Sequence, residues 1–155
     1  MTEITFPYRR QETDFYCAPA SVQMILAREG VEIPQATLAQ MLGTNETVGT
    51  TINAIESLLV SRGFKVMRKN NATIPDIEEA LTNNAAVMVG YVEPTENVPH
   101  YALISSVDMT DIFLTDPWHG PDYRIPRNTF LELWKDDEAN AYGNRMMLAV
   151  FSSKK

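Results

Sequence analysis

The chain of 155 residues is long enough to bury one substantial core, and we expect a single domain over residues 1–155. Its hydrophobic fraction of 45% and its charged fraction of 21% are typical of an ordinary globular protein. The net charge of −7 argues against a nucleic-acid-binding surface, because phosphate contact requires clustered lysine and arginine. We attribute this acidity to solubility rather than to a preference for basic substrates.

The sequence gives no indication of a membrane protein. No apolar run approaches the roughly 18 residues that a membrane-spanning helix needs. The N-terminal residues lack the basic-then-apolar order of a secretory signal. Because a single cysteine cannot form a disulfide within the chain, we expect a reducing, cytoplasmic location.

Helical periodicity dominates the N-terminal part of the chain. Apolar side chains that recur every three or four residues predict helices at 18–29, 34–42 and 52–62. A glycine follows each of these helices and is expected to end it. A polar loop at 44–50 leads into the third helix.

From residue 64 onward the pattern changes to the alternation that is typical of strands. We predict strands at 64–68, 86–92, 101–107, 112–115 and 145–152, and two further helices at 75–82 and 126–134. A turn at 108–111 is expected to join two of the strands as a hairpin. Because helices precede most of the strands, we expect an α+β fold with an antiparallel sheet.

Cys17 is the only cysteine, and it stands where an irregular segment turns into the first predicted helix. Single cysteines are most often small buried hydrophobic residues, so a structural role is one interpretation. At a helix N-terminus, however, unpaired N–H groups and the helix dipole favour an anion by about 0.3–1 kcal/mol. A free thiol has a pKa of about 8.5, and the dipole alone is too weak to ionise it at neutral pH. A reactive Cys17 therefore requires a protonated histidine beside the sulfur.

Two histidines are available as this partner. His100 starts the predicted strand at 101–107 and follows a polar loop at 93–98. His119 lies in a turn-rich loop, where a solvated side chain is the expected alternative. Because a strand positions a base more rigidly than a loop does, we favour His100.

Asp116, which ends the predicted strand at 112–115, is the candidate for orienting His100. A hairpin turn at 108–111 pairs positions whose numbers sum to about 219, so Asp116 is expected opposite residue 103. That position is a few residues from His100, and a bulge or a slip in the pairing would bring the two together. The alternative is that the Asp-Pro pair only starts a turn.

Gln11, six residues before Cys17, is the candidate for completing an oxyanion hole. Its side-chain N–H and the backbone N–H of Cys17 would both donate to a developing oxyanion. One cysteine and two histidines 19 residues apart do not match the ligand spacings of zinc sites, so we expect no metal or other cofactor.

Two loops are candidate walls of a substrate cleft. They are the polar segment at 44–50 and the segment at 117–121, where Trp118 would stack on a substrate. The alternatives, a solvated loop and an aromatic residue that only packs, are left open.

Taken in chain order, these features resemble the C39-like peptidases of the papain-like superfamily. The resemblance rests on Gln11, the run Tyr16-Cys17-Ala18-Pro19-Ala20-Ser21, Gly49-Thr50, Gly63-Phe64, His100-Tyr101 and Asp116-Pro117. It implies a papain-like fold in which N-terminal helices pack on a C-terminal antiparallel sheet. It also implies a cysteine peptidase with Cys17 as nucleophile, His100 as general base, Asp116 as its orienting residue and Gln11 as oxyanion donor. The family's substrates often end in small residues such as Gly-Gly.

One departure from the family pattern concerns Ala18, which stands where the family usually has glycine. Its methyl group would crowd a substrate backbone that passes the sulfur. Three alternatives to a peptide or amide hydrolase remain. They are an acyltransferase that uses the same acyl-enzyme, a catalytically silent peptide-binding module, and an unrelated α+β domain with a buried structural cysteine.

Overall fold

Three helices occupy the N-terminal part of the computed structural model, which describes residues 2–135 and 143–152. They are α1 (Cys17–Arg28), α2 (Gln35–Leu42) and α3 (Ile52–Ser61). The Thr51 side chain caps α3 by accepting a hydrogen bond from the backbone N–H of Ala54. Gly43 ends α2 with a φ of 68°, a left-handed conformation that a side chain disfavours.

The remaining elements build one antiparallel sheet with two more helices. In chain order they are β1 (Lys65–Lys69), α4 (Ile74–Thr82), β2 (Ala86–Glu93), β3 (Val98–Val107), β4 (Asp111–Asp116), β5 (Gly120–Pro126), α5 (Arg127–Leu133) and β6 (Met147–Phe151). The strand order is β1-β6-β2-β3-β4-β5, and every neighbouring pair is antiparallel. The predicted α+β arrangement of early helices and a later antiparallel sheet is confirmed.

β5 is the strand that the sequence pattern did not predict. It begins with Gly120 and Pro121 and ends with Pro126, residues that are typical of turns rather than strands. Its position explains why they are tolerated. β5 lies at the edge of the sheet, where a proline that lacks an N–H breaks no central hydrogen-bond ladder.

The pairing of β3 with β4 contains a bulge at Ser105. Val107 pairs with Ile112, but Ile104 pairs with Leu114, so the register shifts by one residue between these pairs. The backbone oxygen of Ser105 accepts a hydrogen bond of 2.8 Å from the N–H of Ile4, which satisfies this irregular position. The expected pairing of Asp116 with residue 103 is therefore wrong by one residue.

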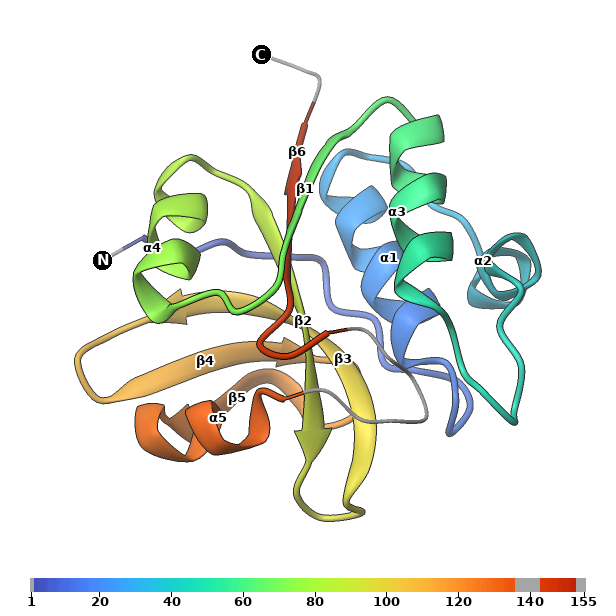
Figure 1. The fold of residues 1–155 in the computed structure, drawn as a ribbon. Coiled ribbons are helices and arrows are strands. Elements are labelled where there is room, and N and C mark those ends of the chain that lie inside the picture. The colour runs from blue at the N-terminus through green and yellow to red at the C-terminus, as the bar shows by residue number, and fades with distance from the viewer. Residues whose placement is uncertain (1, 136–142, 153–155) are drawn as a thin grey trace.

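The helices lie around the sheet in two groups. Figure 1 shows α1, α2 and α3 together on one side and α4 and α5 on the other, with the N-terminal segment crossing between them. α1 is buried along its length, from Ala18 to Ala27, and it packs on α2 and β3. This packing fixes the start of α1, where Cys17 lies, relative to β3.

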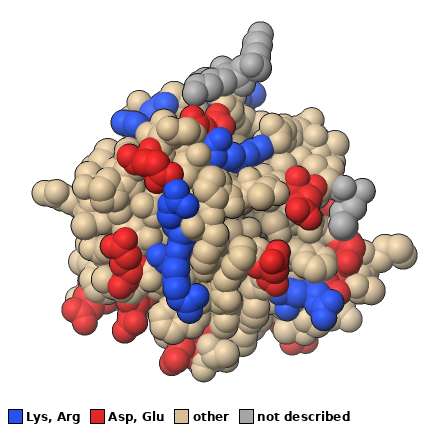
Figure 2. Space-filling model, turned by 180° about the vertical axis from the view of Figure 1, so that it is seen from behind, with Lys and Arg blue, Asp and Glu red and all other residues tan. Residues whose placement is uncertain are grey.

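Charged side chains of both signs are interspersed on the surface that Figure 2 shows. A short central run of basic side chains on this face is bordered by acidic side chains on either side. Within residues 2–135 and 143–152, no helix has the length and apolar character that crossing a membrane requires.

Candidate active site

Cys17 and His100 line the same cleft from two different elements. Cys17 is the first residue of α1 and is partly exposed, whereas His100 lies on β3 and is buried. The Tyr16 side chain does not cap α1, so the first turn of the helix keeps backbone N–H groups near the sulfur. The structure thus brings the thiol and the predicted histidine together.

His100 and Asp116 form a buried ion pair, with 2.9 Å between His100 Nε2 and Asp116 Oδ1. Burial alone would lower the pKa of His100. The hydrogen bond that His100 donates to Asp116, and then the hydrogen bond and charge interaction with Cys17, outweigh burial and raise this pKa to about 10. Burial likewise opposes ionisation of Asp116, but the hydrogen bond and charge of His100 outweigh it and lower the pKa of Asp116. The imidazole is therefore held in its charged form between Cys17 and Asp116.

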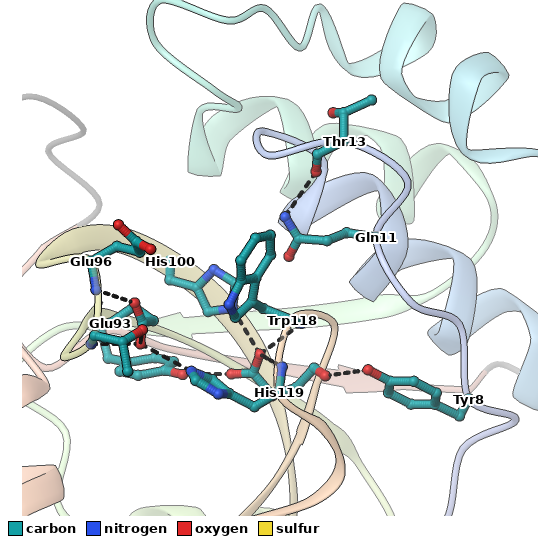
Figure 3. A network of polar contacts seen from close by, with 11 residues as sticks. Tyr8, Gln11, Thr13, Glu93, Glu96, His100, Trp118 and His119 are labelled. Atoms are coloured by element: carbon teal, nitrogen blue, oxygen red, sulfur yellow. Dashed lines mark hydrogen bonds and ion pairs between the residues drawn. The ribbon is translucent and has the colours of Figure 1, made fainter.

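Asp116 is fixed by several donors besides His100 (Figure 3). The hydroxyl of Tyr91 donates to Asp116 Oδ2 at 2.5 Å. The backbone N–H groups of Trp118 and His119 donate to Oδ1 at 2.8 and 3.0 Å. The hydroxyl of Tyr8 donates to the backbone oxygen of Asp116 at 2.6 Å. These contacts leave the carboxylate little freedom to turn away from His100.

Gln11 also lies at the cleft, with 8% of its surface exposed. Its backbone N–H donates to the oxygen of Pro117 at 3.0 Å, and its side-chain Nε2 donates to the oxygen of Thr13 at 2.9 Å. Its side-chain Oε1 is buried and has no hydrogen-bond partner among the described residues. Figure 3 shows this oxygen on the side of Gln11 that faces Trp118, away from Thr13.

The cleft has a volume of about 460 Å³ and is walled by the segment before α1 and by three loops. One is the α2–α3 loop, another is the β2–β3 hairpin, and the third carries Trp118. The hydroxyl of Tyr101, next to His100 on β3, donates to the oxygen of Thr50 at 3.0 Å and so ties the α2–α3 loop to the sheet. Both loops that the sequence offered as candidate walls therefore line the cleft.

The model for the Peptidase_C39 like family matches residues 3–142. The chain belongs to this family. An uncharacterized protein of Methanothermobacter marburgensis is 32% identical to this C39-like protein over 125 residues, which cover 81% of this chain and 80% of that protein. An uncharacterized protein of Methanothermobacter thermautotrophicus is 30% identical over 110 residues, which cover 71% of this chain and 70% of that protein.

Solved structures show the same fold. The peptidase domain of Streptococcus ComA, a bi-functional ABC transporter involved in a quorum sensing pathway, has a TM-score of 0.74 at 15% identity. That comparison covers 99% of this chain and 100% of the other. A double glycine motif protease from an AMS/PCAT transporter, in complex with the leader peptide, has a TM-score of 0.72 at 16% identity, covering 96% and 93% of the two chains. This C39-like protein thus has the α+β papain-like fold that its sequence resemblance implied.

His119 has a structural position that the sequence interpretation missed. Its Nε2 lies 2.9 Å from Glu93 Oε1, and its ring stacks on Tyr123 with centroids 3.9 Å apart. Its side chain is only 17% exposed, so the expected solvated loop histidine is wrong. The sequence carried no signal for the stacking on Tyr123, because Tyr123 lies on β5, a strand that the sequence pattern did not predict.

Glu93 is the buried carboxylate at the base of the β2–β3 hairpin. Burial would raise its pKa, but hydrogen bonds from the side chain and N–H of Thr95, from the N–H of Glu96 and from His119 outweigh burial and lower it to about 2.

Among the described residues of this C39-like protein, no three potential ligands gather as a metal site.

Proposed function

We propose that this C39-like protein is a cysteine hydrolase that cleaves peptide or amide bonds through an acyl-enzyme on Cys17. The observation that carries the proposal is the position of His100, which interacts with Cys17 on one side and with buried Asp116 on the other. A charged imidazole beside the sulfur is what cysteine nucleophiles require. The other ring nitrogen is occupied by a carboxylate, which fixes the tautomer and the orientation of the base.

The proposed reaction starts from the Cys17 thiolate and the His100 imidazolium. The thiolate attacks the substrate carbonyl carbon, and the tetrahedral intermediate places negative charge on the carbonyl oxygen. His100 then donates its proton to the leaving amine as the C–N bond breaks, which leaves a thioester on Cys17. Water attacks the thioester while His100 takes a proton from the water. The Cys17 thiolate then leaves, the acid is released, and the thiolate–imidazolium pair is restored.

Gln11 and the backbone N–H of Cys17 are the proposed donors to the oxyanion. A glutamine amide carries two N–H donors, and in this structure one of them is directed at Thr13. The second N–H remains available to the intermediate. The Tyr16 side chain does not cap α1, so the backbone N–H of Cys17 in its first turn supports the same role.

The substrate and the cellular compartment are proposed by analogy with the family. Leader peptides are bound by a structurally similar double glycine motif protease, so peptides with small residues at the cleavage site are reasonable first substrates. The methyl group of Ala18 would restrict which backbones pass the sulfur. A nucleophilic thiol must stay reduced, which suits a reducing compartment such as the cytoplasm.

Turnover of a small activated ester tests the proposal without knowledge of the peptide substrate. Native protein is mixed with p-nitrophenyl acetate, and intact-mass spectrometry follows the acetyl group on Cys17 over time. We expect rapid acetylation followed by loss of the acetyl group, because His100 activates water for the second step. Cys17→Ala is the control for acetylation of other side chains.

His100→Ala separates catalysis from simple thiol reactivity. We expect Cys17 of this variant to be acetylated slowly by p-nitrophenyl acetate and to keep its acetyl group. A native protein that retains the acetyl group as long as the variant does would contradict a hydrolase. An acyltransferase would instead lose the group only when an amine or thiol acceptor is added, and a silent binding module would not acetylate faster than a free thiol.

A further inference from the structure

Apart from His100, the charged side chains of the cleft are of one sign. Asp14, Glu46, Glu93 and Glu96 line it, and no lysine or arginine among the described residues does. The positive charge of His100 is already opposed by Asp116. A neighbouring hollow of about 410 Å³ shares Asp14 and Glu46 with the cleft and therefore extends the acidic wall. The cleft thus has a surplus of negative charge beside the nucleophile.

A second observation also indicates a ligand that donates hydrogen bonds. Oε1 of Gln11 is buried and has no partner in the described part of the chain, although a buried carbonyl oxygen normally accepts a hydrogen bond. Gln11 is more than nine-tenths buried and lines the cleft, and Figure 3 shows its Oε1 on the side that faces Trp118. This acceptor and the carboxylates of Asp14, Glu46 and Glu96 could all accept hydrogen bonds from N–H donors of a ligand.

Apolar surface stands next to these acceptors. Val48, on the α2–α3 loop, and Val98, at the start of β3, are 43% and 45% exposed, and both line the cleft. Each valine is two residues from a glutamate on its own wall, Glu46 or Glu96. Lysine and arginine have this combination of an aliphatic stem and a cationic head.

We propose that the cleft selects peptides that carry a lysine or arginine close to the bond that reacts with Cys17. The aliphatic stem lies against Val48 and Val98, and the cationic head meets Glu46 and Glu96. This inference rests on the proposed function for the identity of the reacting bond, but the charge preference itself does not require turnover. It gives Glu46 and Glu96 a role that the overall net charge did not suggest.

The charge preference is tested first at the sulfur itself. Cys17 of the native protein is treated with three methanethiosulfonates that carry a trimethylammonium-ethyl, a methyl or a sulfonatoethyl group. Each rate constant is divided by the rate constant for N-acetylcysteine amide, which removes intrinsic reactivity. We expect the normalised cation-to-anion ratio to be at least about tenfold at low salt and to shrink as salt is added.

Variants identify the residues responsible. Glu46→Gln combined with Glu96→Gln should reduce the ratio at least about threefold. Glu78→Gln is the matched control, because Glu78 is exposed on α4 and does not line the cleft. We avoid a change at Glu93, since its carboxylate holds the β2–β3 hairpin together. A normalised ratio near one, or equal effects of the control and the double variant, would overturn the proposal.

Peptide binding distinguishes failure of this inference from failure of the proposed function. The Cys17→Ala protein is titrated with glycine-flanked peptides whose central residue is lysine, norleucine or glutamate, and Kd is measured by NMR. Lysine should bind at least about tenfold more tightly than glutamate, with norleucine between them. No preference for lysine would overturn the charge selection even if Cys17 is catalytic. If the peptides show a lysine preference but the thiol is inert to every reagent, the charge selection is retained and the hydrolase proposal is contradicted.

Discussion

Asp116 lies on the same face of the sheet as His100 because β3 contains one extra residue, Ser105, between the turn and His100. Continuing the observed pairing of Leu103 with Thr115 places Asp116 opposite Ala102. Ala102 is two residues from His100, and side chains two apart share a face. Without the bulge, Asp116 would stand opposite Leu103 and point to the other face. The 2.9 Å ion pair therefore depends on this one-residue shift in the pairing of β3 with β4.

The first prediction concerns alkylation of Cys17 by iodoacetamide as a function of pH. The pKa of His100 is raised, so its imidazolium stays charged in mildly acidic solution. A charged imidazolium beside a thiol is the arrangement that makes cysteines reactive. Native Cys17 should therefore react at pH 5–6 faster than a free thiol, whose pKa is about 8.5. In His100→Ala this low-pH reactivity should disappear. A thiol that reacts only after denaturation would instead show that Cys17 is structural.

Gln11→Ala should separate turnover from thiol reactivity. Loss of one oxyanion donor lowers turnover by about 10²–10³-fold in other hydrolases. Alkylation by iodoacetamide attacks a saturated carbon and forms no oxyanion, so its rate should change little. Both rates are measured on the same preparation. Unchanged turnover would remove Gln11 from the mechanism, and an equal fall in both rates would assign it a positioning role for the N-terminal segment.

The ion pair should make stability depend on pH in two windows. The pKa of His100 is raised to about 10 from its ordinary 6.5, so its stabilising contribution is complete below pH 6.5 and is lost as pH rises toward 10. The pKa of Asp116 is lowered, so its contribution is present above its ordinary value and is lost as pH falls through the folded value. The difference in free energy of unfolding between the native protein and Asp116→Asn should therefore be largest at about pH 4–6.5.

Urea denaturation at a series of pH values measures this difference directly. We expect it to decline on both sides of the maximum. A difference that stays constant from pH 4 to 10 would mean that His100 and Asp116 do not titrate as a pair.

Tyr91→Phe should destabilise the protein through Asp116. The Tyr91 hydroxyl donates to Oδ2 of the buried carboxylate at 2.5 Å, and a hydrogen bond to a charged group contributes about 1.5–3 kcal/mol. Burial and the charge of Asp116 also raise the pKa of Tyr91, which keeps its proton available for donation. Tyr123→Phe is the matched control, since its ring stacks on His119 but its hydroxyl makes no hydrogen bond to the described residues. Equal losses in the two variants would assign the effect to packing.

Local signals account for what the sequence could predict. Helix spacing and the glycine after each helix placed Cys17 at the start of α1, and strand alternation placed His100 near the start of β3. Long-range pairing accounts for the rest. The bulge at Ser105 has no signature in composition, and it decides which face Asp116 occupies. Tyr91 stands directly opposite His100 on β2, a relation that appears only once the register is known.

The N-terminal segment contacts three parts of the site before the chain reaches Cys17. Ile4 donates to the bulge at Ser105, Tyr8 donates to the backbone of Asp116, and the Gln11 N–H donates to Pro117. Figure 1 shows this segment crossing the molecule from α4 toward α1. A protease that removed the residues before Gln11 would therefore break the first two of these contacts, and would release both the bulge and Asp116 without touching Cys17 itself.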